Sequence, residues 1–331
     1  MTTGNARRFT VVFTDGSIRR EAAELLESTC NLRVLDAYPA EQALVAACAD
    51  AHAILARLGT ITAAVIEAAP QLRIIARHGV GVDAVDLEAA TERGVVVTTT
   101  GHENAAAVAE YTFALLLALV RKVVAADTGM REGTWSRDPL VGMELEGKTL
   151  GIVGLGAIGR RVARQAIGFG MRTLAVEPRP GSIAEAGVRL TTLDAVLADA
   201  DVISLHTRLT PDTMHLLNAD AFARMKRGAY LVNTSRGEVV DERALVRALQ
   251  SGALAGAALD TFEHEPLPAD SPLRRMGNVV LSPHVAGQSH DALVRVARSA
   301  AQAILDELSG RRPLHVYNPR AYEVRAARSL R

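Results

Sequence analysis

Short apolar runs alternate with amphipathic stretches along almost the whole chain. The first third contains strand candidates at residues 9–13, 32–35, 53–56, 72–76 and 95–98, and helix candidates at residues 19–28, 40–49 and 62–69. Runs of this length with helical patterns between them are typical of βαβ units. A long apolar stretch at residues 104–131 predicts a helix that leads into the next part of the chain.

The same alternation begins again near residue 149. Six strand candidates lie at residues 149–153, 172–176, 202–205, 229–233, 256–259 and 279–282, with helix candidates at residues 159–168, 192–198, 219–224 and 241–251. Strands with helical crossovers predict a doubly wound parallel sheet. A final helix at residues 291–308 leaves more chain than this sheet needs, so we place it against the N-terminal domain.

The predicted fold class is therefore α/β with two domains. A Rossmann doubly wound parallel sheet, residues 104–286, is inserted in a smaller flavodoxin-like α/β substrate domain. That substrate domain is discontinuous and consists of residues 1–103 and 287–331.

The most informative motif is the glycine-rich turn that follows the strand at residues 149–153. Gly154 permits a tight turn, Gly156 lets a pyrophosphate approach the backbone, and Gly159 lets the following helix pack closely on the strand. The helix N-terminus offers backbone N–H groups, at Ala157 and Ile158, to the phosphates. Glu177 ends the next strand, about 20 residues on, where an acid meets the adenine-side ribose. This stretch predicts a dinucleotide site.

A second stretch, residues 78–85, also fits the glycine pattern through Gly79, Gly81 and Ala84. No acid follows it at the expected distance, and Val82 and Asp83 start a helix poorly. We interpret it as a plain turn or as a substrate-binding loop.

Composition excludes several classes of partner. In 331 residues, Lys plus Arg and Asp plus Glu are 37 each, so the net charge is zero, and aromatic residues make up 4%. Nothing here favours nucleic acid or an anionic membrane, and the longest apolar run, residues 105–120, is short for a membrane span. Cys30 and Cys48 lack metal-ligand spacing and fit a reducing cytoplasm. We predict a cytoplasmic protein without a metal.

Polar residues follow several strands of the second sheet, where open parallel sheets bind ligands. They are Arg236, Asp260, Glu265 and His284. A histidine donates a proton to a ketone oxygen near pH 7, and a carboxylate beside it keeps the imidazole protonated. An arginine binds a substrate carboxylate. Together they suit hydride transfer between a dinucleotide and a 2-keto acid.

Two assignments leave alternatives. His264, beside Glu265, competes with His284 for the role of acid, but His284 directly follows a strand and is better placed. Asp260 stands at a strand end, where it either serves the cofactor or caps the backbone.

Six segments carry a resemblance to a known family, and they lie at residues 77–95, 104–121, 148–163, 233–249, 258–268 and 282–287. The chain resembles the D-isomer-specific 2-hydroxyacid dehydrogenases, a family that includes phosphoglycerate dehydrogenases and hydroxypyruvate and glyoxylate reductases. The resemblance implies Arg236, Glu265 and His284 as the catalytic set. It implies a cofactor role for His206, Thr207, Thr234 and Asp260. It also implies that backbone groups around Val80 and Gly81, with Arg236, bind the substrate carboxylate, and that the protein forms homodimers through the helix that begins near Asn104.

The chain departs from the family at several positions. Glu177 stands where aspartate is usual; it still accepts ribose hydroxyl bonds and repels a 2′-phosphate, so we predict NAD. Arg179 keeps NADP as an alternative. Leu58 replaces a more polar residue and favours a less polar substrate side chain than phosphate. Pro283, in place of glutamine, argues against the formate dehydrogenase branch.

The principal prediction is an enzyme that interconverts a small 2-keto acid and its D-2-hydroxy acid. The alternative is an NADH-sensing binding protein of the same fold, like the family's corepressor members. The sequence has no low-complexity tail and no basic face that would favour this alternative.

Overall fold

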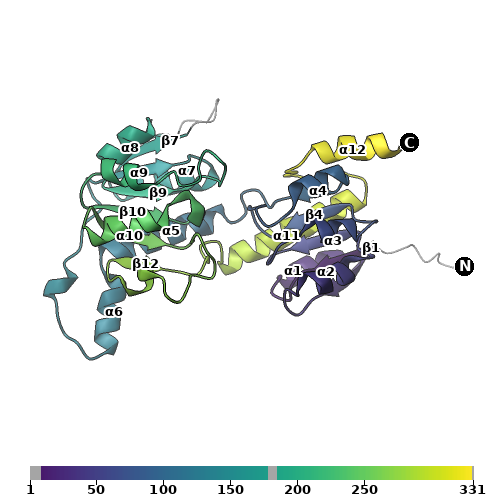
Figure 1. Cartoon of the computed structure of the whole chain (residues 1–331), viewed down its shortest axis with the longest axis horizontal. Helices are drawn as coiled ribbons and strands as arrows, with labels where there is room; N and C mark the ends of the chain where they lie inside the picture. The colour runs from purple at the N-terminus through teal and green to yellow at the C-terminus, as the bar shows by residue number, and fades with distance from the viewer. Residues whose placement is uncertain (1–8, 178–184, 330–331) are drawn as a thin grey trace, which may run out of the picture. The chain divides into compact units, whose positions relative to one another are not determined.

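The computed structural model describes residues 9–177 and 185–329. The chain divides into two compact units: the first unit contains residues 1–104 and 289–331, and the second unit contains residues 105–288. Each unit is built around a parallel β-sheet (Figure 1). The predicted fold class is thus confirmed, whereas Arg179 lies outside the described residues.

The sheet of the first unit has five parallel strands in the order β2-β1-β3-β4-β5. This is the flavodoxin-like order, in which the direction of winding reverses between β1 and β3. The strands are β1 (Phe9–Phe13), β2 (Cys30–Val34), β3 (Ala53–Ala56), β4 (Ile74–Arg77) and β5 (Val96–Thr98).

Helices cover both faces of this sheet (Figure 1). The helices of this unit are α1 (Arg20–Leu26), α2 (Glu41–Cys48), α3 (Ala63–Glu67), α4 (Leu87–Glu92), α11 (His290–Leu308) and α12 (Arg320–Ser329), of which α12 packs on α4 and not on the sheet. Val11 and Phe13 pack with α1 and α11, whereas Val12, on the opposite face, packs with α2, α3 and α4. Because alternate side chains are buried on opposite faces, the strands read as continuous apolar runs.

The second unit contains a seven-stranded parallel sheet in the order β12-β11-β10-β9-β6-β7-β8. The winding reverses between β6 and β9, which is where sheets of this kind bind a dinucleotide. The strands are β6 (Thr149–Val153), β7 (Arg172–Val176), β8 (Val188–Leu190), β9 (Val202–Leu205), β10 (Ala229–Asn233), β11 (Leu254–Leu259) and β12 (Val279–Leu281).

Two groups of helices flank this second sheet (Figure 1). One face packs against α5 (Ala105–Val120) and α7 (Ala157–Gly168), and the other against α8 (Leu193–Asp199), α9 (Ala219–Arg224) and α10 (Glu242–Gln250). The unit also contains α6 (Val123–Arg131) and the 3₁₀ helices η1 (Asp138–Leu140), η2 (Gly237–Val239) and η3 (Pro272–Arg275).

The single helix predicted for residues 104–131 is wrong, because the structure has α5 and α6 there. Lys122, between them, adopts a left-handed conformation with φ of 54°. The carbonyl of Val120, which would continue the helix, instead accepts a hydrogen bond from the N–H of Met143 at 2.9 Å. A contact with a later part of the chain therefore ends α5.

The sequence pattern also missed three elements: β8, α4 and α12. β8 is a short edge strand whose side chains are largely exposed. α4 has six residues, too few for a clear helical period. Six strands were predicted for the second sheet, but because of β8 it has seven in the described part of the second unit.

Side-chain bonds attach α12 to the rest of the first unit. Glu307, 2% exposed near the end of α11, accepts a hydrogen bond from the hydroxyl of Tyr322 at 2.8 Å and pairs with Arg325. Arg325 also donates to the carbonyl oxygens of Gly94 and Arg73. Because these contacts come from charged residues, hydrophobic periodicity did not predict the helix.

Candidate active site

The glycine loop between β6 and α7 requires glycine at two positions. Gly154 has φ of +96°, and a Cβ there would lie 2.6 Å from the carbonyl oxygen of His206. A Cβ on Gly159 would lie 2.1 Å from the carbonyl oxygen of Gly154. The loop is therefore packed against the end of β9 on one side and against its own helix on the other.

This loop fits the pyrophosphate of a dinucleotide. Gly156 is the N-cap residue of α7 and supplies no side-chain cap. The first-turn N–H groups, at Ala157 and Ile158, have no acceptor within the helix and point beyond its N-terminus. They, together with the positive end of the helix dipole, form an anion site at the point where the winding of the sheet reverses.

Glu177 follows β7 beside the glycine loop. One of its carboxylate oxygens, Oε2, accepts a hydrogen bond from the backbone N–H of Leu155 at 3.0 Å. The acid expected to meet the ribose is thus held at the carboxyl edge of the sheet, next to the residues expected to meet the phosphates.

His206 and Thr207 directly follow β9, on the other side of the point where the winding of the sheet reverses. Nε2 of His206 lies 2.8 Å from the hydroxyl of Ser204, and burial lowers the pKa of His206 to about 3. Its other ring nitrogen, Nδ1, is buried and has no partner among the described residues. A neutral imidazole with an unsatisfied buried atom beside the glycine loop fits a site that a cofactor completes.

Thr234 and Arg236 lie in the turn that follows β10. Asn233 organises this turn: its side-chain oxygen accepts from the N–H of Ser235 at 3.0 Å, and its side-chain nitrogen donates to the carbonyl of Arg236 at 2.8 Å. The hydroxyl of Thr234 lies 3.0 Å from that of Thr112 on α5. Sequence reasoning missed Asn233, although asparagine at a strand end is a known turn former.

Glu265 and His284 are brought together by the structure. Oε2 of Glu265 lies 2.8 Å from Nδ1 of His284, while Oε1 accepts from the backbone N–H of Phe262 at 3.1 Å. His284, not His264, is the histidine paired with the carboxylate.

This pairing shifts both pKa values in opposite directions. The hydrogen bond that His284 donates to Glu265 raises the pKa of His284 and outweighs the effect of burial. For Glu265, burial acts to raise the pKa, but the hydrogen bond and charge of His284 overcome it and the pKa is lowered. Arg236 is near enough for its positive charge to lower the pKa of both groups.

Asp260 fixes the backbone around His284. It is fully buried, and its two carboxylate oxygens accept from the backbone N–H groups of Val285 at 2.9 Å and Ala286 at 2.8 Å. The hydroxyl of Ser282 also donates to Asp260 at 2.6 Å. His284 itself has φ of 54°, a conformation that needs such support. Asp260 therefore caps this backbone, its cofactor role stays a prediction, and Ser282 is a residue that sequence reasoning missed.

Val80 and Gly81 belong to the first unit and follow β4. The guanidinium of Arg77 donates to the carbonyl of Gly81 at 3.0 Å. The next helix, α4, begins only at Leu87, after the N-cap residue Asp86. The segment is a loop and not a strand–turn–helix phosphate site, so its backbone N–H groups remain candidates for binding a carboxylate.

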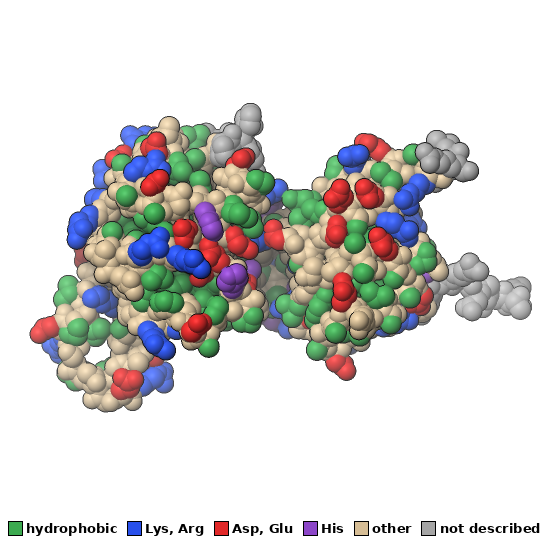
Figure 2. Space-filling view, viewed as in Figure 1, with side chains coloured by type: hydrophobic (Ala, Val, Ile, Leu, Met, Phe, Trp, Pro, Cys, Tyr) green, Lys and Arg blue, Asp and Glu red, His purple; other side chains and the backbone are tan. Residues whose placement is uncertain are grey.

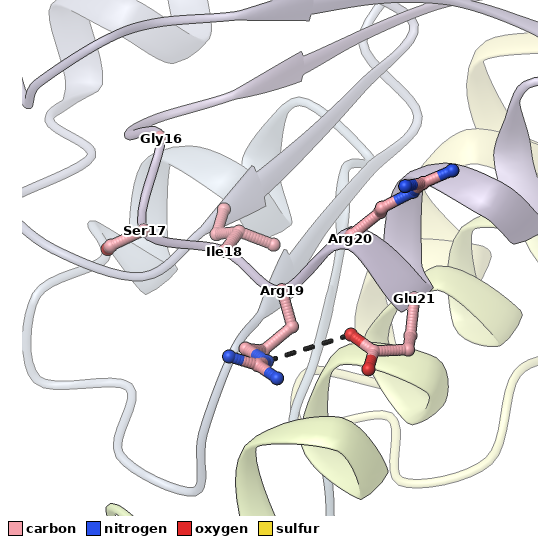
Figure 3. Close-up of a pocket in the computed structure, with 6 residues that line it drawn as sticks. All are labelled: Gly16, Ser17, Ile18, Arg19, Arg20 and Glu21. Carbon is pink, nitrogen blue, oxygen red and sulfur yellow. Dashed lines mark ion pairs between the residues drawn. The ribbon is translucent and has the colours of Figure 1, made fainter. Parts of the chain in front are cut away.

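A surface pocket of the first unit follows β1 and is lined by Gly16, Ser17, Ile18, Arg19, Arg20 and Glu21 (Figure 3). The side chains of Arg19 and Glu21 point toward each other there, with Nε of Arg19 3.7 Å from Oε2 of Glu21. The pocket contains none of the predicted substrate residues, so it does not define the active site.

Neither sign of charge dominates the visible face of either unit (Figure 2). Acidic and basic side chains are interspersed over the visible face of each unit (Figure 2). No helix within the described ranges is long and apolar enough to cross a membrane. In the same ranges, no group of three or more His, Cys, Asp or Glu residues is arranged to hold a metal ion.

A glycine loop where the winding of a parallel sheet reverses, and a carboxylate-paired histidine in the same unit, are typical of NAD(P)-dependent dehydrogenases. Residues 113–286 match the family model described as the D-isomer specific 2-hydroxyacid dehydrogenase, NAD binding domain. The chain belongs to the D-isomer specific 2-hydroxyacid dehydrogenase family. It is an oxidoreductase that interconverts 2-keto acids and 2-hydroxy acids with NAD(P).

Three similar proteins illustrate the range of this family. A glyoxylate reductase of Korarchaeum cryptofilum is 43% identical over 88% of this chain and 90% of its own. The D-3-phosphoglycerate dehydrogenase of Homo sapiens is 42% identical, but the match covers 85% of this chain and 53% of that protein. The solved NADPH-dependent glyoxylate/hydroxypyruvate reductase of Sinorhizobium meliloti is 32% identical over 94% of this chain and 99% of its own, with a TM-score of 0.85.

Proposed function

We propose that this enzyme reduces small, unphosphorylated 2-keto acids of the glyoxylate and hydroxypyruvate type, with Arg236, Glu265 and His284 as its catalytic residues. The observation that carries the catalytic assignment is the 2.8 Å bond between Glu265 and His284, which raises the pKa of the imidazole. The substrate class follows from the glyoxylate reductase relative, which matches over nearly its full length. Leu58, half-exposed in the substrate unit, suits a side chain without phosphate.

The proton-transfer step follows from the geometry of the pair. Protonated His284 donates through Nδ1 to Glu265, which leaves its Nε2 proton for the carbonyl oxygen of the substrate. A dinucleotide held by the glycine loop would supply the hydride for this reduction. Arg236 binds the substrate carboxylate through its guanidinium.

The cofactor site consists of Gly154, Gly156, Ala157, Ile158 and Gly159, with Glu177, His206, Thr207, Thr234 and Asp260 around it. We propose that NAD(H) is preferred, because the carboxylate of Glu177 repels a 2′-phosphate at the ribose. Cys30 and Cys48 are buried and lack metal-ligand spacing, which fits a reducing compartment such as the cytoplasm.

A homodimer is the proposed assembly. The helix that begins at Ala105 is buried over most of its length, but α6, which follows it, buries none of its residues. Val123, Val124 and Met130 on α6, and Trp135 and Val141 beyond it, are each more than half exposed. An apolar surface of this kind is typical of a subunit contact.

The reaction is tested by following NADH and NADPH oxidation with glyoxylate, hydroxypyruvate, pyruvate and phosphohydroxypyruvate. We expect turnover with NADH and the first two acids. His284→Asn should lower kcat by about 10²- to 10⁴-fold while NADH still binds. Wild-type turnover in this variant would refute the assignment of His284.

The relatives named above are reductases and dehydrogenases, and no observation favours the NADH-sensing alternative.

A further inference from the structure

The loop that carries Glu265 has no regular secondary structure of its own. It leaves β11 at Asp260 and runs through residues 261–265, so other parts of the second unit must fix its shape. Within the loop, the N–H of Phe262 donates to Glu265. This internal bond orients the carboxylate relative to the loop but does not anchor the loop to the domain.

Glu263 supplies the anchor, two residues before Glu265. Its backbone N–H donates to the side chain of Glu242 at 2.7 Å, and its own carboxylate accepts from the N–H of Glu242 at 3.5 Å. Glu242 is the first residue of α10. These reciprocal bonds attach the loop to the start of a helix.

His215 engages the same carboxylate from a third segment. Its Nε2 lies 2.6 Å from Oε1 of Glu263. The backbone of His215 is left-handed, with φ of 49°, and its N–H donates to the carbonyl of Glu238 at 2.8 Å. A histidine held in this uncommon conformation presents its ring to Glu263 from the segment that follows the cofactor-lining residues His206 and Thr207.

The turn after Arg236 also contacts the loop that carries Glu265. A Cβ on Gly237 would lie 1.9 Å from the carbonyl carbon of Phe262, so the two backbones are in direct contact. The segments that carry Arg236 and Glu265, and the one that continues from His206, therefore meet at Glu263.

Several charged groups surround this junction. Burial raises the pKa of Glu242, and the negative charges of Glu263 and Glu238 act in the same direction, whereas His264 opposes them. His215 gives Glu263 a hydrogen-bond partner within this acidic cluster. Figure 2 shows histidine side chains lying among acidic ones on the visible face of the second unit.

We infer that His215 and Glu263 form a positioning pair that holds the Glu265 loop in register with His284. The inference rests on the proposed catalytic role of Glu265 and His284. Neither member of the pair contacts the reacting atoms; they act through Glu265. Loss of the pair lets Glu265 drift from His284, so the imidazole binds its proton less tightly and presents it less accurately.

The test compares Glu263→Ala, Glu263→Gln and His215→Ala by the pH dependence of kcat/KM for keto-acid reduction. Glu263→Ala and His215→Ala should lower kcat on the order of 10-fold. They should also move the alkaline loss of activity to lower pH, with little change in NADH affinity measured by fluorescence. Glu263→Gln keeps the hydrogen-bonding shape and should recover part of the loss.

His264→Asn is the matched control. It lies in the same loop and is exposed. Its charge acts on Glu242, but the substitution breaks none of the hydrogen bonds that anchor the loop, so the kinetics should stay close to those of the wild type. A folded Glu263→Ala enzyme with an unchanged kcat and pH profile would overturn the inference, as would an equal loss in His264→Asn.

Glu265→Gln separates this inference from the proposed function. If Glu265→Gln shifts the pH profile and Glu263→Ala does not, the positioning pair is refuted and the catalytic pair stands. If neither shifts it, the proposed catalytic pair itself fails.

Discussion

At the scale of single residues, we predict that the proposed catalytic pair of Glu265 and His284 determines the pH dependence of the reaction. His284 has a raised pKa, so the protonated form needed for reduction persists to higher pH and is lost as the pH rises through that value. Glu265→Gln removes the main cause of the raised pKa. We expect the alkaline loss of reductase activity to move to lower pH.

The pH dependence of kcat/KM in both reaction directions measures this effect. The magnitude of kcat/KM should fall by up to about 10²- to 10⁴-fold, the range for loss of a positioned acid–base group. Oxidation of the hydroxy acid needs neutral His284, so the variant should retain that direction to lower pH than the wild type. An unshifted profile would show that another group controls proton transfer.

Two glycines of α7 provide a matched pair of substitutions. Gly159→Ala places a methyl group 2.1 Å from a backbone oxygen, which should cost about 1–3 kcal/mol of stability and weaken NADH binding. Gly168→Ala, in the same helix, meets nothing within 4 Å and should stabilise the protein by about 0.5–1 kcal/mol. Urea unfolding and NADH titration of both variants test the contrast; equal effects would contradict it.

The residues of the site were predictable to different degrees. Gly154 and Gly159 follow from a motif whose spacing is imposed by steric contact, and the structure supplies those contacts. Asp260 was open between two roles, because a sequence does not reveal which N–H groups a carboxylate meets. Asn233 and Ser282 were missed, since their hydrogen bonds are formed only once neighbouring strands are in place.

At the scale of secondary-structure elements, α12 depends on a buried carboxylate. Glu307 accepts from Tyr322 and pairs with Arg325, both on α12, and it is 2% exposed. Removing one partner of a buried pair leaves the other charge uncompensated. We predict that Glu307→Gln lowers the free energy of unfolding by about 3 kcal/mol, measured by urea denaturation.

Asp306→Asn is the control for this prediction. Asp306 is adjacent and also pairs with an arginine, but that arginine, Arg311, is mostly exposed. A surface pair of this kind contributes less than about 1 kcal/mol. Equal destabilisation by the two variants would show that burial of the Glu307 pair is unimportant.

Elements were predictable where burial determines the pattern. Strands β1, β3, β6, β7, β9 and β10 begin and end where the apolar runs do, because both faces of a central parallel strand are covered. β8 was missed because it is an edge strand with exposed side chains. The break between α5 and α6 was missed because a hydrogen bond from Met143 causes it, and no local sequence signal indicates that bond.

At the scale of the whole molecule, the proposed dimer gives a further prediction. Trp135 is 75% exposed, next to the apolar residues of α6. Trp135→Glu should place a charge in the subunit contact and yield a species of 35.1 kDa, the mass of one chain. Light scattering after size-exclusion chromatography measures the mass.

Leu314→Glu is the matched control, since Leu314 is 77% exposed in the first unit, outside α6. We expect this variant to keep the wild-type mass. If the wild type already has the mass of one chain, the dimer proposal is wrong.

The insertion of one unit within the other has a consequence for synthesis on the ribosome. Helix α11 packs on α1 and on the β1 face that contains Val11 and Phe13, yet residues 105–288 are translated between them. At a translation rate of roughly 5–20 residues per second, α11 is synthesised on the order of 10 s or more after β1. Until then α11 is not available to bury that face. The nascent N-terminal segment thus exposes an apolar sheet surface while the dinucleotide-binding unit emerges and folds, which makes it a natural client for ribosome-associated chaperones.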